Sequence, residues 1–223
     1  MIEYKKSFLF RSLTFWLTCL CVALFFGGIY NWTLVYGWLL FDVQSFFSFG
    51  AIRQGQVWRL LSPCFLHQSL WHLLFNLGWL WILGLQIESR LSKIRMVLLI
   101  ALIGMGSNVV QYLVEGPFFE GISGVVMGFV GFIWVRQKKY PQEGYPLPEA
   151  AIKATCLFVL LGVSIEGICV LLRALFSFDI SFPIANTAHV VGGGMGCLLG
   201  LFPFFTTRSQ QELHLYKKKK MII

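Results

Sequence analysis

The sequence predicts an all-α polytopic membrane protein, built as a bundle of six transmembrane helices with a short fourth helix. Hydrophobic residues make up 57% of the 223-residue chain and charged residues only 13%. Soluble domains are roughly 45–50% apolar and about 25% charged. A soluble fold of this size would need far more polar surface. The apolar stretches and the placement of the Lys and Arg residues also support a membrane protein.

Six apolar stretches account for most of the chain. About 20 residues of helix are needed to cross the hydrocarbon core of a bilayer. The stretches are 12–31, 69–88, 96–114, 123–135, 150–172 and 185–205. A signal peptide is the disfavoured alternative for the first stretch, which is long and lacks a small-x-small cleavage site. We therefore expect a short N-terminal segment over 1–11, a membrane domain over 12–206 and a basic tail over 207–223.

The segments between these stretches are alternately rich and poor in Lys and Arg. If the N-terminus is cytoplasmic, 15 of the 18 lie on the cytoplasmic side, and Arg53, Arg59 and Arg173 lie on the other. Cytoplasmic loops carry an excess of such residues. The split predicts that both termini are cytoplasmic and, for a bacterial chain, that the protein lies in the inner membrane.

The net charge of +8 does not indicate a nucleic-acid partner. The basic residues sit in short groups between apolar stretches, and they do not line one face of a soluble domain. The last group, 217–220, is placed to lie near anionic membrane lipid. The six cysteines show no CxxC spacing, and five of them lie within apolar stretches. We expect no disulfide framework, metal site or cofactor.

The segment 32–68 is too long for a plain turn and is rich in aromatic residues. It carries three Trp and several Phe residues among Gly and polar residues. Aromatic residues with polar neighbours favour the bilayer interface. We expect an external loop that lies partly in the membrane surface and contains short helices.

Polar residues within apolar stretches are candidates for function. His72 and Asn76 are four residues apart, so they share one face of a helix. A helix–helix hydrogen bond without chemistry is an equally weighted explanation of this pair. Glu88 reads as a boundary charge with a structural partner, and the pattern assigns no role to Glu166.

Ser123 stands at the start of an unusually short stretch. Only 13 residues separate it from Arg136, which is roughly 20 Å of helix. A span needs about 30 Å, so the helix is expected to begin roughly 10 Å below the outer surface. Irregular backbone at that depth must be buried or face water. A hydroxyl beside the free N–H groups of a helix start is suited to acyl chemistry.

Two glycine faces predict that the fourth and sixth stretches are in contact. Gly192, Gly196 and Gly200 follow His189 at helical spacing, and Gly124, Gly128 and Gly131 are similarly spaced after Ser123. Small residues let membrane helices approach closely. Such packing would bring His189 within hydrogen-bond reach of Ser123. The alternative is that the glycines only pack and His189 is a bystander.

Taken together, these residues resemble the rhomboid family of intramembrane proteases, specifically its short six-helix bacterial type. The resemblance covers residues 12–206. Four motifs occur in the family's order and on the expected stretches: Trp58-Arg59, His72-x-x-x-Asn76, Gly121-x-Ser123-Gly124, and Ala188-His189 with Gly192 and Gly196.

The resemblance implies a serine endopeptidase that cuts single-span membrane proteins near the outer membrane face. Ser123 would be the nucleophile, and His189 would be the general base and then the general acid. His72, Asn76 and the Ser123 backbone N–H would hold the oxyanion. The glycines of the motifs, with Trp58 and Arg59, would support the site. The implied partners are transmembrane substrates and lipid.

Two positions depart from the family pattern. Met127 stands where some bacterial members carry a Tyr that packs against the catalytic His. Glu120 stands three residues before the serine, where a small residue is common. Neither departure removes a catalytic atom, so both bear on substrate specificity more than on activity.

Two other functions compete with the protease. A catalytically silent rhomboid-like protein that binds membrane clients would typically lack the Ser or the His, and both are present here. A small transporter or channel would place polar residues such as Asn108, Gln111 and Glu166 along a path. The sequence shows no inverted repeat of the kind many transporters have.

Overall fold

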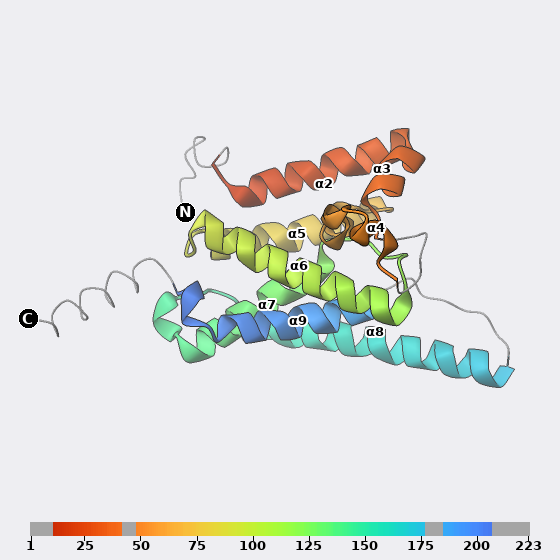
Figure 1. Cartoon of the computed structure of the whole chain (residues 1–223). Coiled ribbons are helices and arrows are strands. Elements are labelled where there is room, and N and C mark those ends of the chain that lie inside the picture. The colour runs from red at the N-terminus through yellow and green to blue at the C-terminus, as the bar shows by residue number, and fades with distance from the viewer. Residues whose placement is uncertain (1–10, 42–47, 177–184, 207–223) are drawn as a thin grey trace, which may run out of the picture.

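The computed structural model describes residues 11–41, 48–176 and 185–206, and all regular structure in these ranges is helical. Six helices of 15 or more residues cover the six predicted stretches: α2 (Leu13–Tyr30), α5 (Leu70–Glu88), α6 (Lys93–Glu115), α7 (Ser123–Lys139), α8 (Glu149–Phe176) and α9 (Asn186–Gly200). Figure 1 shows them running side by side, with α8 extending beyond its neighbours. The predicted all-α fold is confirmed.

Four of these helices are long and apolar enough to cross a membrane. They are α2, α5, α6 and α8, judged over the described residues. The other two are shorter, with 17 residues in α7 and 15 in α9. The six-span count therefore stays a prediction.

The starts of three helices follow from their capping residues. Ser12, Ser69 and Ser92 precede α2, α5 and α6, and each hydroxyl accepts a hydrogen bond from a backbone N–H of the first turn. Serine is a preferred residue at this position because it satisfies an N–H that has no partner within the helix. These caps place the heads of α5 and α6 within a few residues of their predicted starts.

Glu88, at the end of α5, binds the head of α2. Its carboxylate accepts hydrogen bonds from the hydroxyls of Ser12 and Thr14, both at 2.8 Å, and from the backbone N–H groups of Leu13 and Thr14. A carboxylate is favoured at a helix N-terminus, where the free N–H groups carry partial positive charge. The prediction of a structural partner for Glu88 is confirmed.

The segment between α2 and α5 contains the expected short helices. They are α3 (Trp32–Leu39), α4 (Gly50–Arg53), and the 3₁₀ turns η1 (Val57–Leu60) and η2 (Ser62–Phe65). Arg59 is buried and donates to the carbonyl oxygens of Gly37 and Leu40, at 2.8 and 2.6 Å, near the end of α3. The Trp58 indole N–H donates to the Trp38 carbonyl at 3.0 Å. This pair therefore ties the loop together.

The α7–α9 contact is built on glycine. A Cβ at Gly192 would overlap the Gly124 carbonyl oxygen, and a Cβ at Gly196 would overlap the Gly128 carbonyl oxygen. Each helix backbone therefore lies against the backbone of the other. These four glycines are called the glycine seam below. The predicted contact between the fourth and sixth stretches is confirmed.

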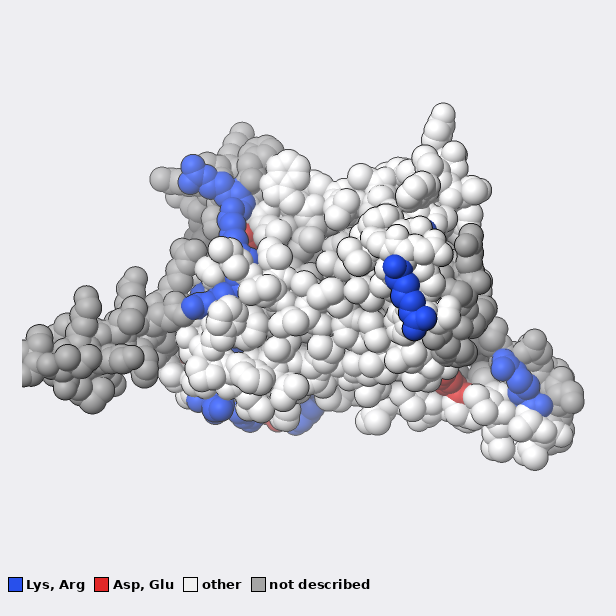
Figure 2. Space-filling view, in the orientation of Figure 1, with Lys and Arg blue, Asp and Glu red and all other residues white. Residues whose placement is uncertain are grey.

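At the other end of α7, Arg136 lies inside the bundle. Its guanidinium is fully buried and pairs with Glu143, which follows α7 in the 3₁₀ turn η3 (Pro141–Glu143). It also donates to the Gly200 carbonyl at 3.2 Å, which binds the end of α9. Helix α7 accordingly continues past residue 135 to Lys139. Figure 2 shows Lys and Arg near the two ends of one face, with a broad uncharged band between them.

Candidate active site

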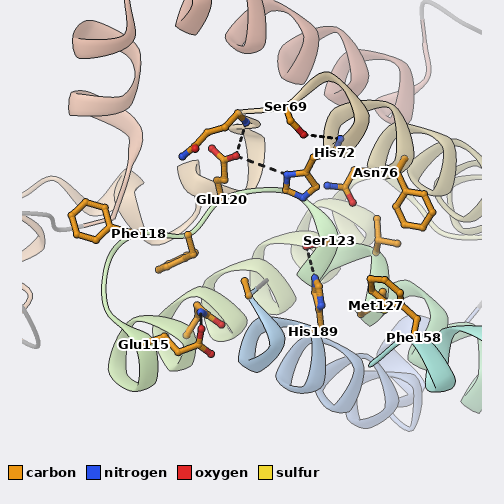
Figure 3. Close-up of a pocket in the computed structure, with 16 residues that line it drawn as sticks. Ser69, His72, Asn76, Glu115, Phe118, Glu120, Ser123, Met127, Phe158 and His189 are labelled. Carbon is orange, nitrogen blue, oxygen red and sulfur yellow. Dashed lines mark hydrogen bonds and ion pairs between the residues drawn. The ribbon is translucent and has the colours of Figure 1, made fainter. Parts of the chain in front are cut away.

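The heads of α7 and α9 bring a serine and a histidine together. Ser123 is the first residue of α7, and His189 lies in the first turn of α9. The distance from His189 Nε2 to Ser123 Oγ is 2.8 Å, and both residues are buried. Figure 3 shows the imidazole pointing at the hydroxyl across the two helix heads. This is the geometry in which an imidazole takes a proton from an alcohol.

Ser123 lies well below the Glu115 end of α6. A Cβ at the adjacent Gly124 would lie 2.9 Å from Ser107 Oγ, so Gly124 is level with Ser107. Helix α6 continues eight residues beyond Ser107 to Glu115, which is about 12 Å of helix. The segment between Glu115 and Ser123 therefore turns back into the bundle, as the shortness of the fourth stretch predicted.

A cavity opens over the serine and the histidine. Its volume is about 430 Å³, and its 16 lining residues come from helices α5 to α9 and the segments before α5, α7 and α9. The lining includes His72, Asn76, Ser123 and His189 (Figure 3). The predicted nucleophile, general base and oxyanion side chains are thus brought to one cavity. Trp58, Arg59 and the seam glycines Gly192 and Gly196 are not among its lining residues.

Neighbouring helices hold the first turn of α9. The Ala188 backbone N–H donates to Gln111 Oε1 at 2.8 Å, and the Thr187 hydroxyl donates to Glu115 Oε1 at 2.6 Å. From α8, Glu166 accepts a hydrogen bond from Asn186 Nδ2 at 2.8 Å. The Gln111 contact satisfies a backbone N–H that a helix start leaves without an internal partner, and the other two contacts fix side chains of the same turn. They give Glu166 a role in anchoring the helix that carries His189.

The other side of the His189 ring has no acidic partner among the described residues. Its Nδ1 atom is buried without a hydrogen-bond partner in that part of the chain. An aromatic ring from α8 lies beside it instead, with the Phe158 and His189 ring centroids 6.0 Å apart. Met127 also lines the cavity. An aromatic neighbour of the histidine is therefore present, supplied by α8 in place of the residue four positions after the serine.

His72 and Asn76 face the backbone that leads into α7. Gly121 in that segment has a φ of +104°, a conformation that disfavours side chains. A Cβ there would lie 2.7 Å from His72 Cε1, 2.9 Å from His72 Nε2 and 3.3 Å from Asn76 Nδ2. Only glycine lets these polar groups come so close to the irregular segment before Ser123. The placement explains the first glycine of the Gly121-x-Ser123-Gly124 motif.

His67 belongs to the same polar group as His72 and Asn76, and the sequence analysis did not predict it. Its Nε2 atom lies 3.1 Å from Asn76 Nδ2, which donates to it. The residue is buried, and burial lowers the pKa of His67 to about 3, with the nearby charge of His72 as a smaller cause. His67 is therefore neutral near pH 7 and can accept this bond. Its position just before α5 was the only feature of the sequence that could have indicated a place in this site.

Comparison with known proteins shows the family of the chain. Residues 54–204 match the model of the Rhomboid domain family. The chain belongs to the rhomboid family. It is 33% identical over 199 residues to Rhomboid protease GlpG of Yersinia pestis and of Yersinia pseudotuberculosis, covering 88% of this chain. It is 35% identical over 144 residues to Rhomboid protease GlpG of Klebsiella pneumoniae, covering 64% of this chain.

This rhomboid chain is shorter than the relatives it matches. The matched region spans 63% of the length of the Yersinia proteins and 47% of the Klebsiella protein. Family membership and the four long apolar helices together make the chain an integral membrane protein of the bacterial type.

Proposed function

We propose that this rhomboid is an intramembrane serine endopeptidase that uses Ser123 and His189 as a catalytic dyad. The observation that carries the proposal is the 2.8 Å separation of His189 Nε2 and Ser123 Oγ at the floor of a cavity. The name of the bacterial relatives, Rhomboid protease GlpG, supports the same chemistry.

The chemistry follows from the dyad. Ser123 Oγ attacks the scissile carbonyl carbon while His189 Nε2 takes the hydroxyl proton. The tetrahedral intermediate collapses to an acyl-enzyme as the imidazolium returns the proton to the leaving amine. Water then adds to the ester carbonyl, with His189 again acting as base, and Ser123 is released. The Gln111 and Glu115 contacts to the first turn of α9 keep the imidazole in place without a third catalytic residue.

The developing oxyanion needs hydrogen-bond donors that are already in position. Three are proposed: the backbone N–H of Ser123, the His72 ring and the Asn76 amide. The N–H groups of the first turn of α7 lack intrahelical partners. One Asn76 Nδ2 hydrogen is directed to His67, which leaves the second available for the intermediate.

The proposed substrate is a single-span membrane protein cut near the outer face. The proposed orientation has six spans over 12–206, both termini in the cytoplasm and the cavity open to the outer side. The sunken start of α7 supports it, because a cavity below the end of α6 lets water reach a cleavage site in the membrane. The cluster of basic residues that ends α7, with Lys138 and Lys139, is proposed to lie on the cytoplasmic side.

The direct test is cleavage of single-span substrates by the purified protein in detergent or liposomes. The parent should cut, and Ser123→Ala and His189→Ala should each reduce cleavage by at least about a thousandfold. Both variants should accumulate in the membrane as the parent does. Equal cleavage by the parent and Ser123→Ala would remove the protease proposal.

A chemical probe distinguishes the protease from a catalytically silent rhomboid that only binds membrane clients. A fluorophosphonate should label the parent at Ser123 and fail to label Ser123→Ala. A parent that binds single-span clients but is neither labelled nor able to cut them would favour the client-binding function. Ion or solute flux in proteoliposomes would be required for a transporter.

A further inference from the structure

Glu120, the acidic residue that departs from the family pattern, reaches the oxyanion side of the cavity. Its side chain is only 11% exposed. Glu120 Oε1 lies 3.9 Å from His72 Nδ1 and accepts a hydrogen bond of 2.5 Å from the Gln68 backbone N–H. Figure 3 shows the carboxylate pointing at the edge of the His72 ring. The carboxylate thus connects the segment before α7 to the head of α5.

The His72 ring lies between Glu120 and Gly121. The Nδ1 atom faces the Glu120 carboxylate, whereas Cε1 and Nε2 are the atoms that approach Gly121. The Gly121 backbone N–H donates to the Pro63 carbonyl at 3.0 Å. This bond fixes the segment before α7 that carries Glu120 and Gly121. A ring turned by 180° would place the carbon Cδ2 against the carboxylate and exchange the positions of Cε1 and Nε2 beside Gly121. Attraction between Glu120 and an Nδ1–H group therefore selects one of the two ring orientations.

Few other charges compete for the ring. No Lys or Arg lines the cavity among the described residues, and the other acidic lining residue is Glu115. The oxygens of Glu115 accept hydrogen bonds from Gln111 and Thr187. The titratable neighbours of His72 and Glu120 are His67, with ring centroids 5.1 Å apart, His189 across the cavity and Tyr36 of α3. Burial, followed by the Glu120 charge, raises the pKa of Tyr36, so this neighbour stays uncharged.

We infer that Glu120 is a positioning residue that orients His72 as an oxyanion donor. The inference rests on the proposed function. In this orientation Nδ1 faces the Glu120 carboxylate, and Nε2 is the ring nitrogen directed at the oxyanion. Glu120 touches no reacting atom and exchanges no proton during the reaction. Because the carboxylate holds the ring in place before the oxyanion forms, this arrangement favours the transition state.

The test is a double-mutant cycle on His72 and Glu120, with cleavage of one single-span substrate as the readout. Glu120→Gln keeps an oxygen that accepts from Gln68 but removes the charge. It should lower kcat about tenfold and leave KM within about twofold, as expected for an interaction made in the transition state. In the His72→Ala background the same substitution should have no further effect, because the residue through which it acts is gone.

A matched control is Glu149→Gln at the start of α8. Glu149 is exposed and pairs with Lys153. The kcat and KM of the Glu149→Gln variant should therefore equal those of the parent. An unchanged kcat for Glu120→Gln, or a full tenfold loss on top of His72→Ala, overturns the inference. So does a loss of kcat that is matched by a lower unfolding temperature and a raised KM, which would mark a purely structural role.

The same assay separates the inference from the proposed function. A parent that cuts, with Ser123→Ala inactive, upholds the protease whatever Glu120→Gln does. A parent that does not cut, or a Ser123→Ala variant that cuts equally, overturns the protease proposal and the inference with it.

Discussion

The glycine seam joins α7 to α9 by contacts between backbones, whereas the head of α5 is held to the site by side-chain hydrogen bonds. Along the seam, Gly192 and Gly196 leave no room for a Cβ against Gly124 and Gly128. At the head of α5, His67 binds Asn76 and Glu120 faces His72. The serine and histidine are therefore placed by close packing, and the oxyanion side chains are placed by polar contacts that substitutions can adjust.

This difference predicts how each region responds to substitution. Backbones in contact cannot yield to an added atom without moving both helices, because packed interiors have few voids. A hydrogen-bonded side chain can be replaced by one that keeps the bond and changes the charge. Seam variants should therefore lose folding and activity together, and variants at the head of α5 should lose mainly kcat.

The broadest effect, on folding and cleavage together, is expected from Gly196→Ala. Its Cβ would collide with the Gly128 carbonyl oxygen and push α9 away from α7. A displacement of about 1 Å at the dyad should reduce cleavage about a hundredfold. The unfolding temperature in detergent should fall as well.

Gly194→Ala on the same helix is the matched control for Gly196→Ala. In the part of the chain that the structure describes, no atom outside its own helix lies within 4 Å of a Cβ at Gly194. This variant should keep the cleavage rate and unfolding temperature of the parent. Equal losses from the two substitutions would show that the seam does not set the dyad geometry.

A narrower effect, confined to kcat, is expected from Asn76→Ala. Removal of one oxyanion donor typically lowers kcat about 10²- to 10³-fold. The KM for a single-span substrate should change little, because the amide acts mainly in the transition state. Steady-state kinetics would measure both. Leu74→Ala, at an exposed position of the same helix, should behave as the parent. A raised KM with unchanged kcat would place Asn76 in substrate binding.

The smallest effect is expected from His67→Gln, which keeps an acceptor for Asn76 but removes a group that titrates. Because burial lowers the pKa of His67 from 6.5 to about 3, the unfolded chain binds the proton more readily than the folded chain. The parent should lose stability as the pH falls from about 6.5 toward about 3, and should not respond to this group above that range.

Unfolding temperatures between pH 4 and pH 7 would test the His67 prediction. The variant should show a shallower decline than the parent on acidification, with kcat at pH 7 within about threefold of the parent. Identical declines would show that another group controls the acid response.

Periodic features were readable from the sequence, and contacts between side chains of separate segments were not. The four-residue spacing of His72 and Asn76 and the glycine faces of the seam repeat at helical intervals, so they predicted which faces meet. Gln111 of α6, which binds the Ala188 N–H, and Phe158 of α8, which lies beside His189, follow no such pattern. No local feature of the sequence predicts the burial of Arg136 against Glu143.

Composition and spacing were enough to predict a helical membrane protein, the starts of its long helices, and the positions of Ser123 and His189 at the heads of two glycine-faced helices. These features act within one segment, so they can be recognised in order along the chain. The contacts of Glu120 with His72, of His67 with Asn76 and of Glu166 with the head of α9 became apparent only in the folded chain. These contacts depend on the relative depth and rotation of packed helices, which no single segment encodes.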